Sequence, residues 1–198
     1  PDLAGLDEIE SAGYRMVGPA HFFDNAYAGS AHGVEKGGLT TLGRELIAQL
    51  EARSMLVDLA HSSARTIDDV LAIARRPVVA SHTGVRGVAD NARNLTDDQL
   101  RGIASTGGMV GIGFWPTASG GGDAAAIARS ITYAAGVAGV DHVGLGSDFD
   151  GGVPVPFDAS GLVLVTDALL AEGLDEASVG KVVGGNAIRL LRAGLPES

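Results

Sequence analysis

The chain has no cysteine among its 198 residues, and only 5% of its residues are aromatic. Without thiolates, neither a disulfide framework nor a cysteine-ligated zinc site can form. Basic residues are also scarce, because 14 Lys and Arg face 24 Asp and Glu and leave a net charge of −10. Such a chain lacks the basic stripe that neutralises nucleic-acid phosphates, so we expect no nucleic-acid partner.

Long hydrophobic runs are absent as well. No stretch approaches the roughly 20 apolar residues that a membrane-spanning helix needs, and we expect no membrane span. The first residues do not resemble a signal peptide, and the last ones do not form a hydrophobic tail for a lipid anchor. We therefore favour a cytoplasmic localisation.

What the chain does contain is a series of short apolar runs that alternate with helical periodicity. Strands are predicted at 14–17, 55–59, 78–80, 109–112 and 143–145. Helical patterns separate most of them, residues 24–40 read as a long loop, and the tail reads as two or three helices over 159–191, broken at Gly173 and at Gly184 and Gly185. This alternation indicates an α/β fold with a parallel sheet, in a single domain over residues 1–198. An open doubly wound sheet also fits five strands, but its glycine-rich phosphate fingerprint is missing.

Three of the predicted strands end in side chains that can bind metals or move protons. His61 follows strand 55–59, His82 follows strand 78–80, and Asp148 and Asp150 follow strand 143–145. Parallel barrels place their chemistry at the carboxyl ends of the strands, where neighbouring strands lie about 4.8 Å apart. The two imidazoles could therefore share a zinc ion, and one of the carboxylates could be a ligand or a general base. The alternative is that each histidine only ends a strand and that the carboxylates are solvated in a turn.

Two further residues are candidates for the same edge of the sheet. His21 follows strand 14–17, and Arg93 lies in the loop after His82. The planar fork of an arginine suits a carboxylate, although a surface Arg93 paired with Asp90 or Asp97 is an equal alternative.

Other polar residues are set aside at this point. We predict that His32 is solvated in the glycine-rich loop and that His142 lies at the wrong end of its strand. Asp58 lies inside a strand, where it is either a buried partner of the site or a polar residue facing a helix, and we favour the latter. Asp148 and Asp150 should point to the same side if their segment is extended.

Several segments together resemble the membrane dipeptidase family, also called renal dipeptidases, which are zinc peptidases of the amidohydrolase superfamily. The likeness spans essentially the whole chain, and the order and spacing of its motifs agree. The matching segments are 38–45 (GLTTLGRE), 56–61 (LVDLAH), 81–83 (SHT), 91–94 (NARN), 146–151 (GSDFDG) and 184–189 (GGNAIR).

The resemblance implies a (β/α)8 TIM-type barrel that hydrolyses dipeptides with two zinc ions bridged by a glutamate. It implies that His61 and His82 bind the second zinc and that Asp148 manages the proton of the attacking water. His21 then contacts the substrate and steadies the oxyanion, and Arg93 holds the substrate carboxylate. Trp115 stands where the family has an aromatic residue beside the site.

The chain departs from the family at its first strands. It lacks the His-x-Asp pair that binds the first zinc in the family, and it lacks the bridging glutamate. Glu8 and Glu10 lie in the predicted first helix, and we do not expect either of them to take the place of that glutamate. We therefore expect roughly the last five βα units of the barrel plus its C-terminal helices. The rest of the site must come from a missing N-terminal barrel segment or a partner chain, and a homodimer is a possible assembly. The alternatives are a non-catalytic fragment or structural half, and another amidohydrolase such as a lactonase.

Overall fold

Five parallel strands form one sheet in the computed structural model, which describes residues 2–195. The strands are β1 Met16–Val17, β2 Leu56–Asp58, β3 Val78–Thr83, β4 Met109–Ile112 and β5 Val143–Leu145, and they lie side by side in the order of the sequence. The five expected strands are therefore confirmed. The first two are shorter than predicted, and β3 continues three residues beyond Ala80 so that it includes His82.

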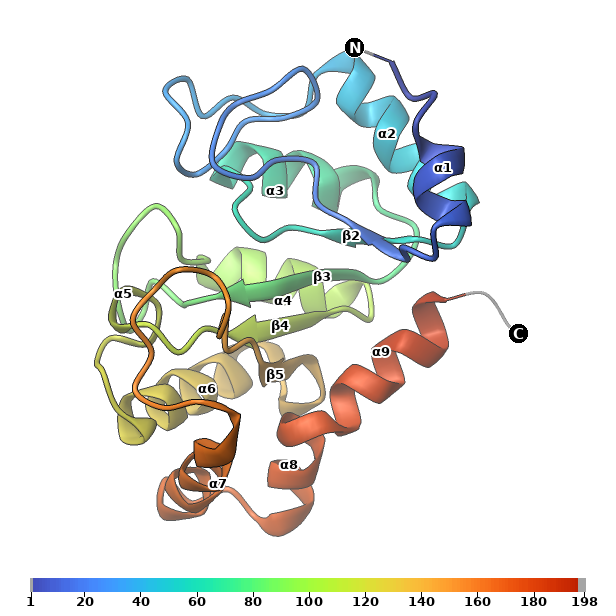
Figure 1. Ribbon diagram of the computed structural model, residues 1–198. Coiled ribbons are helices and arrows are strands. Elements are labelled where there is room, and N and C mark those ends of the chain that lie inside the picture. The colour runs from blue at the N-terminus through green and yellow to red at the C-terminus, as the bar shows by residue number, and fades with distance from the viewer. Residues whose placement is uncertain (1, 196–198) are drawn as a thin grey trace.

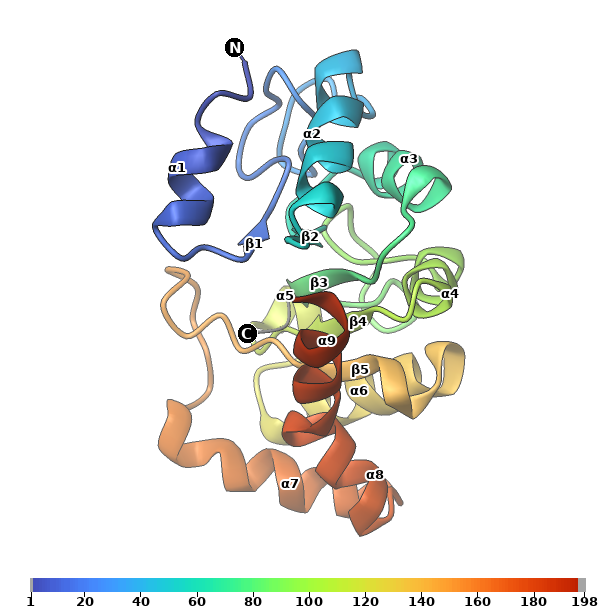
Figure 2. The ribbon, with the colours of Figure 1, turned by 90° about the vertical axis from the view of Figure 1, so that its right-hand side faces the viewer.

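Helices fill the connections between the strands, as parallel pairing requires. In Figure 2, α3, α4 and α6 lie along one face of the sheet. The helices of this part of the chain are α1 Leu6–Ser11, α2 Thr41–Ala52, α3 Ala64–Ile73, α4 Asp97–Ser105, α5 Pro116–Ser119 and α6 Ala124–Ala138, followed by the 3-10 turn η1 Val140–His142. The sequence analysis did not predict α5. No described helix has both the length and the apolar character needed to cross a membrane.

Four of these helices begin at a side chain that accepts a backbone hydrogen bond from the first turn. Thr40, Ser63, Thr96 and Asp123 cap α2, α3, α4 and α6 in this way. At α4 the side chain of Gln99 accepts from the backbone N–H of Thr96, which completes a capping box. Because the caps fix where each helix starts, they also fix where the preceding loops, which carry the site, must end.

The sheet buries side chains on both faces. Alternate residues of a strand point to opposite sides. Val57, Ala80 and Val110 belong to the main core shared with the helices, whereas Leu56, Val79 and Met109 form a second cluster with Leu190. This second cluster lies on the opposite face of the sheet from the main core.

The C-terminal part is helical and returns to the amino ends of the strands. It consists of η2 Ala159–Gly161, α7 Leu162–Ala171, α8 Glu176–Gly180, the π-helical turn η3 Lys181–Gly185 and α9 Asn186–Gly194. The predicted breaks are confirmed, because Gly173 has a φ of 92° and Gly184 has non-helical backbone angles. Figure 1 shows α9 beside the strands at the end opposite to their arrowheads.

Candidate metal and substrate site

Two histidine rings meet at the carboxyl edge of the sheet. His61 follows β2, His82 lies near the end of β3, and their ring centroids are 4.8 Å apart. The two Nε2 atoms face each other at 2.8 Å. His21, which follows β1, stacks beside them with its ring centroid 4.2 Å from that of His61. The structure thus brings together the three histidines that the sequence placed after consecutive strands.

The other ring nitrogen of His82 belongs to a chain of polar contacts. His82 Nδ1 lies 2.8 Å from Ser81 Oγ, and this hydroxyl donates to Asp58 Oδ2 over 2.6 Å. Asp58 Oδ1 accepts from the backbone N–H groups of Ser81 and Ala60. The expectation that Asp58 faces a helix is therefore wrong: β2 and β3 are neighbours, so its carboxylate reaches across to the site.

The other ring nitrogen of His61 also has a partner, and it is a residue that the sequence analysis set aside. His32 is exposed, as predicted, but its Nε2 also lies 3.2 Å from His61 Nδ1, so this residue contacts the site as well as the solvent. Sequence periodicity could not place His32, because it lies in the irregular loop of residues 24–40. The one feature of the sequence that could have pointed to His32 is the length of this loop, because long irregular connections in compact domains are often functional.

The electrostatic environment keeps the imidazoles of His61, His82 and His32 neutral. Burial, reinforced by the positive charge of Arg93, lowers the pKa of His61 to about 3. The same two causes lower the pKa of His82 and of His32. Because the neutral imidazole is the form that binds a metal, the site presents its nitrogens in the competent protonation state.

Arg93 points into the site and not toward the surface acids. Its Nη2 donates to the carbonyl of His82 over 2.6 Å, and its guanidinium lies 5.7 Å from the ring centre of Trp115. Asp90 and Asp97 instead pair with other arginines. Burial lowers the pKa of Arg93 to about 10, which leaves it positively charged at neutral pH.

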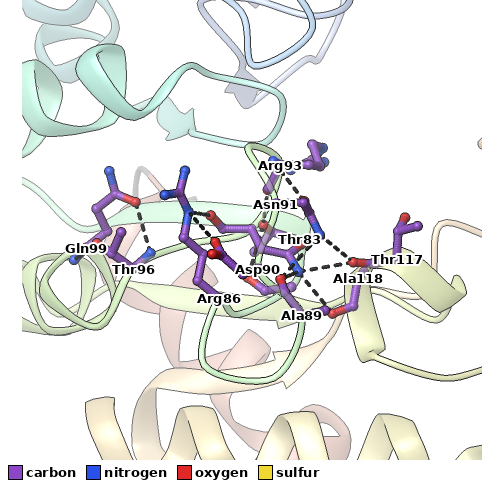
Figure 3. Close-up of polar contacts among 12 residues, drawn as sticks. Thr83, Arg86, Ala89, Asp90, Asn91, Arg93, Thr96, Gln99, Thr117 and Ala118 are labelled. Atoms are coloured by element: carbon purple, nitrogen blue, oxygen red, sulfur yellow. Dashed lines mark hydrogen bonds and ion pairs between the residues drawn. The ribbon is translucent and has the colours of Figure 1, made fainter.

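The loop around Arg93 is held in place by polar contacts to its neighbours. The side chain of Asn91 accepts from the backbone of Arg93 and donates to the carbonyl of Thr117, while Thr83 donates to the carbonyl of Arg93 (Figure 3). These contacts link the loop after β3 to the segment after β4. These hydrogen bonds hold the backbone of Arg93 in place and so fix the point from which its guanidinium enters the site.

Asp148 is a further polar residue of the site. It has a left-handed backbone with a φ of 59° and begins a turn in which Gly151 donates to its carbonyl. The segment is therefore not extended at Asp148, so the condition under which Asp148 and Asp150 would point to the same side is not met. A Cβ on Gly151 would lie 2.1 Å from Asp148 Oδ1, so a larger residue at this position would displace the carboxylate. Asp148 is half-buried, whereas Asp150 is exposed.

Two adjoining hollows open between these side chains. They have volumes of about 230 and 310 Å³ and share Phe22, His61, Asp148 and Gly151 in their walls. Arg93, Trp115 and His32 line the first hollow, and His21, His82 and Asp150 line the second. Volumes of this size are at the low end for ligand pockets and suit a small substrate.

The comparisons with known proteins agree with this geometry. The model of the membrane dipeptidase family, peptidase family M19, matches residues 1–194. The chain belongs to the membrane dipeptidase family. A crystal structure described as dipeptidase AC, a metallopeptidase of family M19, superposes with a TM-score of 0.89 at 31% identity and covers 97% of this chain. The five-stranded sheet and its helices are therefore part of a (β/α)8 barrel, which confirms the expected fold class.

Other relatives give the extent of the match. A Klebsiella pneumoniae protein, described as uncharacterized and in the pqqA 5′ region, is 34% identical over 94% of this chain and 74% of its own length. A metallopeptidase from Rhodobacter sphaeroides, liganded with a phosphinate mimic of the dipeptide L-Ala-D-Ala, is 32% identical with a TM-score of 0.88, over 97% of this chain and 59% of that one. The chain thus spans 61% of the dipeptidase AC chain and 59% of the Rhodobacter one.

The donor set of this dipeptidase-family chain fits part of a metal centre. Two neutral imidazole nitrogens that face each other at 2.8 Å suit zinc in type. Among residues 2–195, however, no group of three or more His, Cys, Asp or Glu side chains is arranged to hold a metal ion. The two imidazoles are fewer than the three or more protein ligands that zinc sites use.

The last motif of the resemblance lies far from this edge. Asn186 donates to the carbonyls of Val140 and Val143, and Arg189 donates to those of Gly107, Gly108 and Asp141. His142 precedes β5 at the end of the strand away from the site, as predicted, and its Nδ1 lies 2.8 Å from the carbonyl of Gly108. This motif of the family therefore serves the packing of α9 and not the site.

Proposed function

We propose that this chain supplies the larger part of the active site of a zinc-dependent dipeptidase. The observation that carries the proposal is the pair of Nε2 atoms 2.8 Å apart, set in the same hollows as Arg93 and Asp148. Family membership supports the reaction class. By the complete enzyme we mean this chain together with the part of the barrel that it does not span.

In the complete enzyme, His61 and His82 would hold a zinc ion through Nε2. The remaining ligands would come from the part of the barrel that this chain does not span. When bound, zinc supplies a water of lowered pKa as nucleophile and polarisation of the scissile carbonyl.

The carboxylate of Asp148 is the group that moves the proton. It lies in both hollows, half-buried, within the fields of Arg93 and His82. There it accepts the proton of the attacking water and passes it to the leaving amine, which is ordinary general base and general acid catalysis. His21, at the rim of the same hollow, donates to the oxyanion that forms on the former carbonyl oxygen.

Arg93 selects the length of the substrate. Its guanidinium binds the free carboxylate of the dipeptide, and the ring of Trp115 supports the guanidinium. Because the carboxylate is anchored one residue away from the scissile bond, longer peptides do not fit. The Rhodobacter relative with its L-Ala-D-Ala mimic supports a D-residue at the C-terminal position as an accepted substrate.

The test compares a dipeptide with the same dipeptide amidated at its C-terminus. We expect the complete enzyme to prefer the free acid strongly and Arg93→Ala to erase most of that preference, chiefly through KM. Arg93→Lys keeps the charge but loses the planar fork, so it should restore the preference only in part. Steady-state kinetics on both substrates measure the effect.

The matched control is Arg101→Ala, which removes a surface arginine that pairs with Asp97 and Asp98 on α4. It should change neither substrate's kinetics. A panel of lactones run beside the dipeptides separates a peptidase from a lactonase. Hydrolysis of lactones alone, or of dipeptides with no dependence on zinc, would contradict the proposed function.

A further inference from the structure

His32 lies against the side of His61 that faces away from His82. Its Nε2 is 3.2 Å from His61 Nδ1, whereas His61 meets His82 through Nε2. His32 is therefore on the opposite edge of the His61 ring from the point where the two metal-binding nitrogens converge. It is placed to act on His61 and not to join His82 as a ligand of the same ion.

The loop that carries His32 is organised by one carboxylate. Asp24 Oδ1 accepts from the backbone of Ser30, and Asp24 Oδ2 accepts from the backbone of Glu35, both over 2.8 Å. A Cβ on Gly33 would lie 2.0 Å from Asp24 Oδ1, so a glycine is needed beside this carboxylate. The loop thus closes around Asp24 with His32 between its two anchored positions.

The same loop is bonded directly to the backbone of His61. The N–H of Ala31 donates to the carbonyl of His61 over 2.8 Å, and Ser30 forms an isolated antiparallel bridge with Ser62. The hydroxyl of Ser30 accepts from the N–H of His32 over 3.1 Å. Backbone and side-chain contacts therefore fix His32 and His61 relative to each other on both sides of the ring contact.

A histidine that binds a metal through one ring nitrogen carries its proton on the other nitrogen. That N–H needs an acceptor, which sets the tautomer and holds the ring at the angle the metal requires. His82 has its acceptor in Ser81, backed by Asp58. The only ring nitrogen with which His61 Nδ1 is paired in the structure, over residues 2–195, is His32 Nε2.

We infer that His32 is a positioning residue for the metal ligand His61, and that it accepts a hydrogen bond from His61 Nδ1–H through its own Nε2. This inference rests on the proposed function, because it requires His61 to bind zinc through Nε2. The ring of Phe22 lies beside the pair, with its centroid 5.2 Å from that of His32 and 5.3 Å from that of His61. His32 thus does for His61 what Ser81 and Asp58 do for His82.

The experiment measures zinc affinity in the complete enzyme freed of metal, by competition with a chromogenic chelator. His32→Ala should weaken binding of one zinc ion by about 10- to 100-fold, which is the typical effect of losing such a partner. His32→Gln should recover most of the affinity, because the amide oxygen of glutamine can accept at a similar reach. Val34→Ala, which changes a 93% exposed side chain of the same loop, is the control and should leave affinity unchanged.

A second readout follows the ring protons in long-range proton–nitrogen NMR spectra of the zinc-loaded protein. The Nδ1 proton of His61 should exchange rapidly with solvent in His32→Ala, and that of His82 should stay as in the parent. A merely structural role of His32 would disturb both rings or neither, and that result would overturn the inference.

Parallel measurements on His61→Ala separate the inference from the proposed function. Zinc affinity that does not depend on His61 would contradict the proposed function and the inference with it. Affinity that depends on His61 but is unchanged in both His32 variants would overturn the role of His32 alone.

Discussion

At the scale of single residues, two residues of the site have strained backbone angles, and hydrogen bonds from neighbouring loop residues hold them in place. His61 and Asp148 have φ angles of 64° and 59°, in the left-handed region that residues with a Cβ avoid. Such a conformation costs about 1–2 kcal/mol per residue and survives only where surrounding contacts hold it. The bond from Ala31 to His61 and the bond from Gly151 to Asp148 supply that support. Both residues that we propose for the chemistry are thus held by their loops.

The two carboxylates after β5 should differ sharply in their contribution to turnover. Asp148→Asn removes the group that moves the proton but keeps its shape, so we expect normal folding, most of the metal retained and kcat lowered about 100-fold or more. Asp150→Asn is the matched control: the Asp150 side chain is exposed, two residues further into the turn, and its loss should change kcat little. Metal analysis and steady-state kinetics on both variants check this, and a larger loss in Asp150→Asn would reverse the assignment.

Part of this site could be predicted from strand ends, and part could not. His21, His61 and His82 each follow an apolar run, and parallel strands bring their carboxyl ends to one edge. His32 and Asp58 act through contacts across loops and between strands, which no periodicity records. Such residues become visible only when the tertiary structure shows what their side chains touch.

At the scale of elements, helix α9 packs against the amino ends of the strands and holds them together. The side chain of Asn186 is only 2% exposed and donates to the carbonyls of Val140 and Val143, over 2.7 and 2.8 Å. Leu190 of the same helix packs on Leu56, Val79 and Met109. The helix therefore covers the second core cluster and ties η1 and β5 to it.

Asn186→Ala should destabilise the fold without touching the site. One buried and one partly buried carbonyl lose their donor, and we expect the free energy of unfolding to fall by about 2 kcal/mol. Ile188→Ala, at a 52% exposed position of the same helix, should cost much less. Denaturant unfolding of the parent and both variants measures the difference. Equal losses in the two variants would show that the helix surface, and not the Asn186 bonds, carries the stability.

The elements themselves were more predictable than their ends. Strands 109–112 and 143–145 match the sequence pattern residue for residue, because both are short apolar runs that begin after glycine-rich or polar turns. β1 is only two residues long because it pairs with β2 over Met16 and Val17 alone. α5 escaped prediction because four residues between Trp115 and Gly120 are too few to show a helical period.

At the scale of the whole molecule, the sheet is open at both sides. Over residues 2–195, β1 pairs with β2 alone and β5 with β4 alone. At the β1 edge, Tyr14 is 64% and Met16 43% exposed, and both line a shallow hollow of about 340 Å³. Exposed strand edges pair readily with other chains, whereas a closed barrel has none.

These open edges and the incomplete donor set predict how residues 1–198 behave alone. We expect weak zinc binding and little or no dipeptidase activity, because two imidazoles are too few for a zinc site and because strands beside β1 and β5 are missing from the described sheet. We also expect concentration-dependent association through the edges, which size-exclusion chromatography would show.

Adding the part of the barrel that this chain does not span should reverse all three properties together. A segment that carries the His-x-Asp pair and the bridging glutamate should restore two zinc ions per complex, activity on dipeptides and a single discrete species in size-exclusion chromatography. The same segment added to His61→Ala should still close the barrel but leave one zinc ion bound weakly and turnover low, which separates folding from chemistry. Full activity of purified residues 1–198 with zinc and no other polypeptide would contradict this prediction, because it would mean that the groups in residues 1–198 complete the metal centre by themselves.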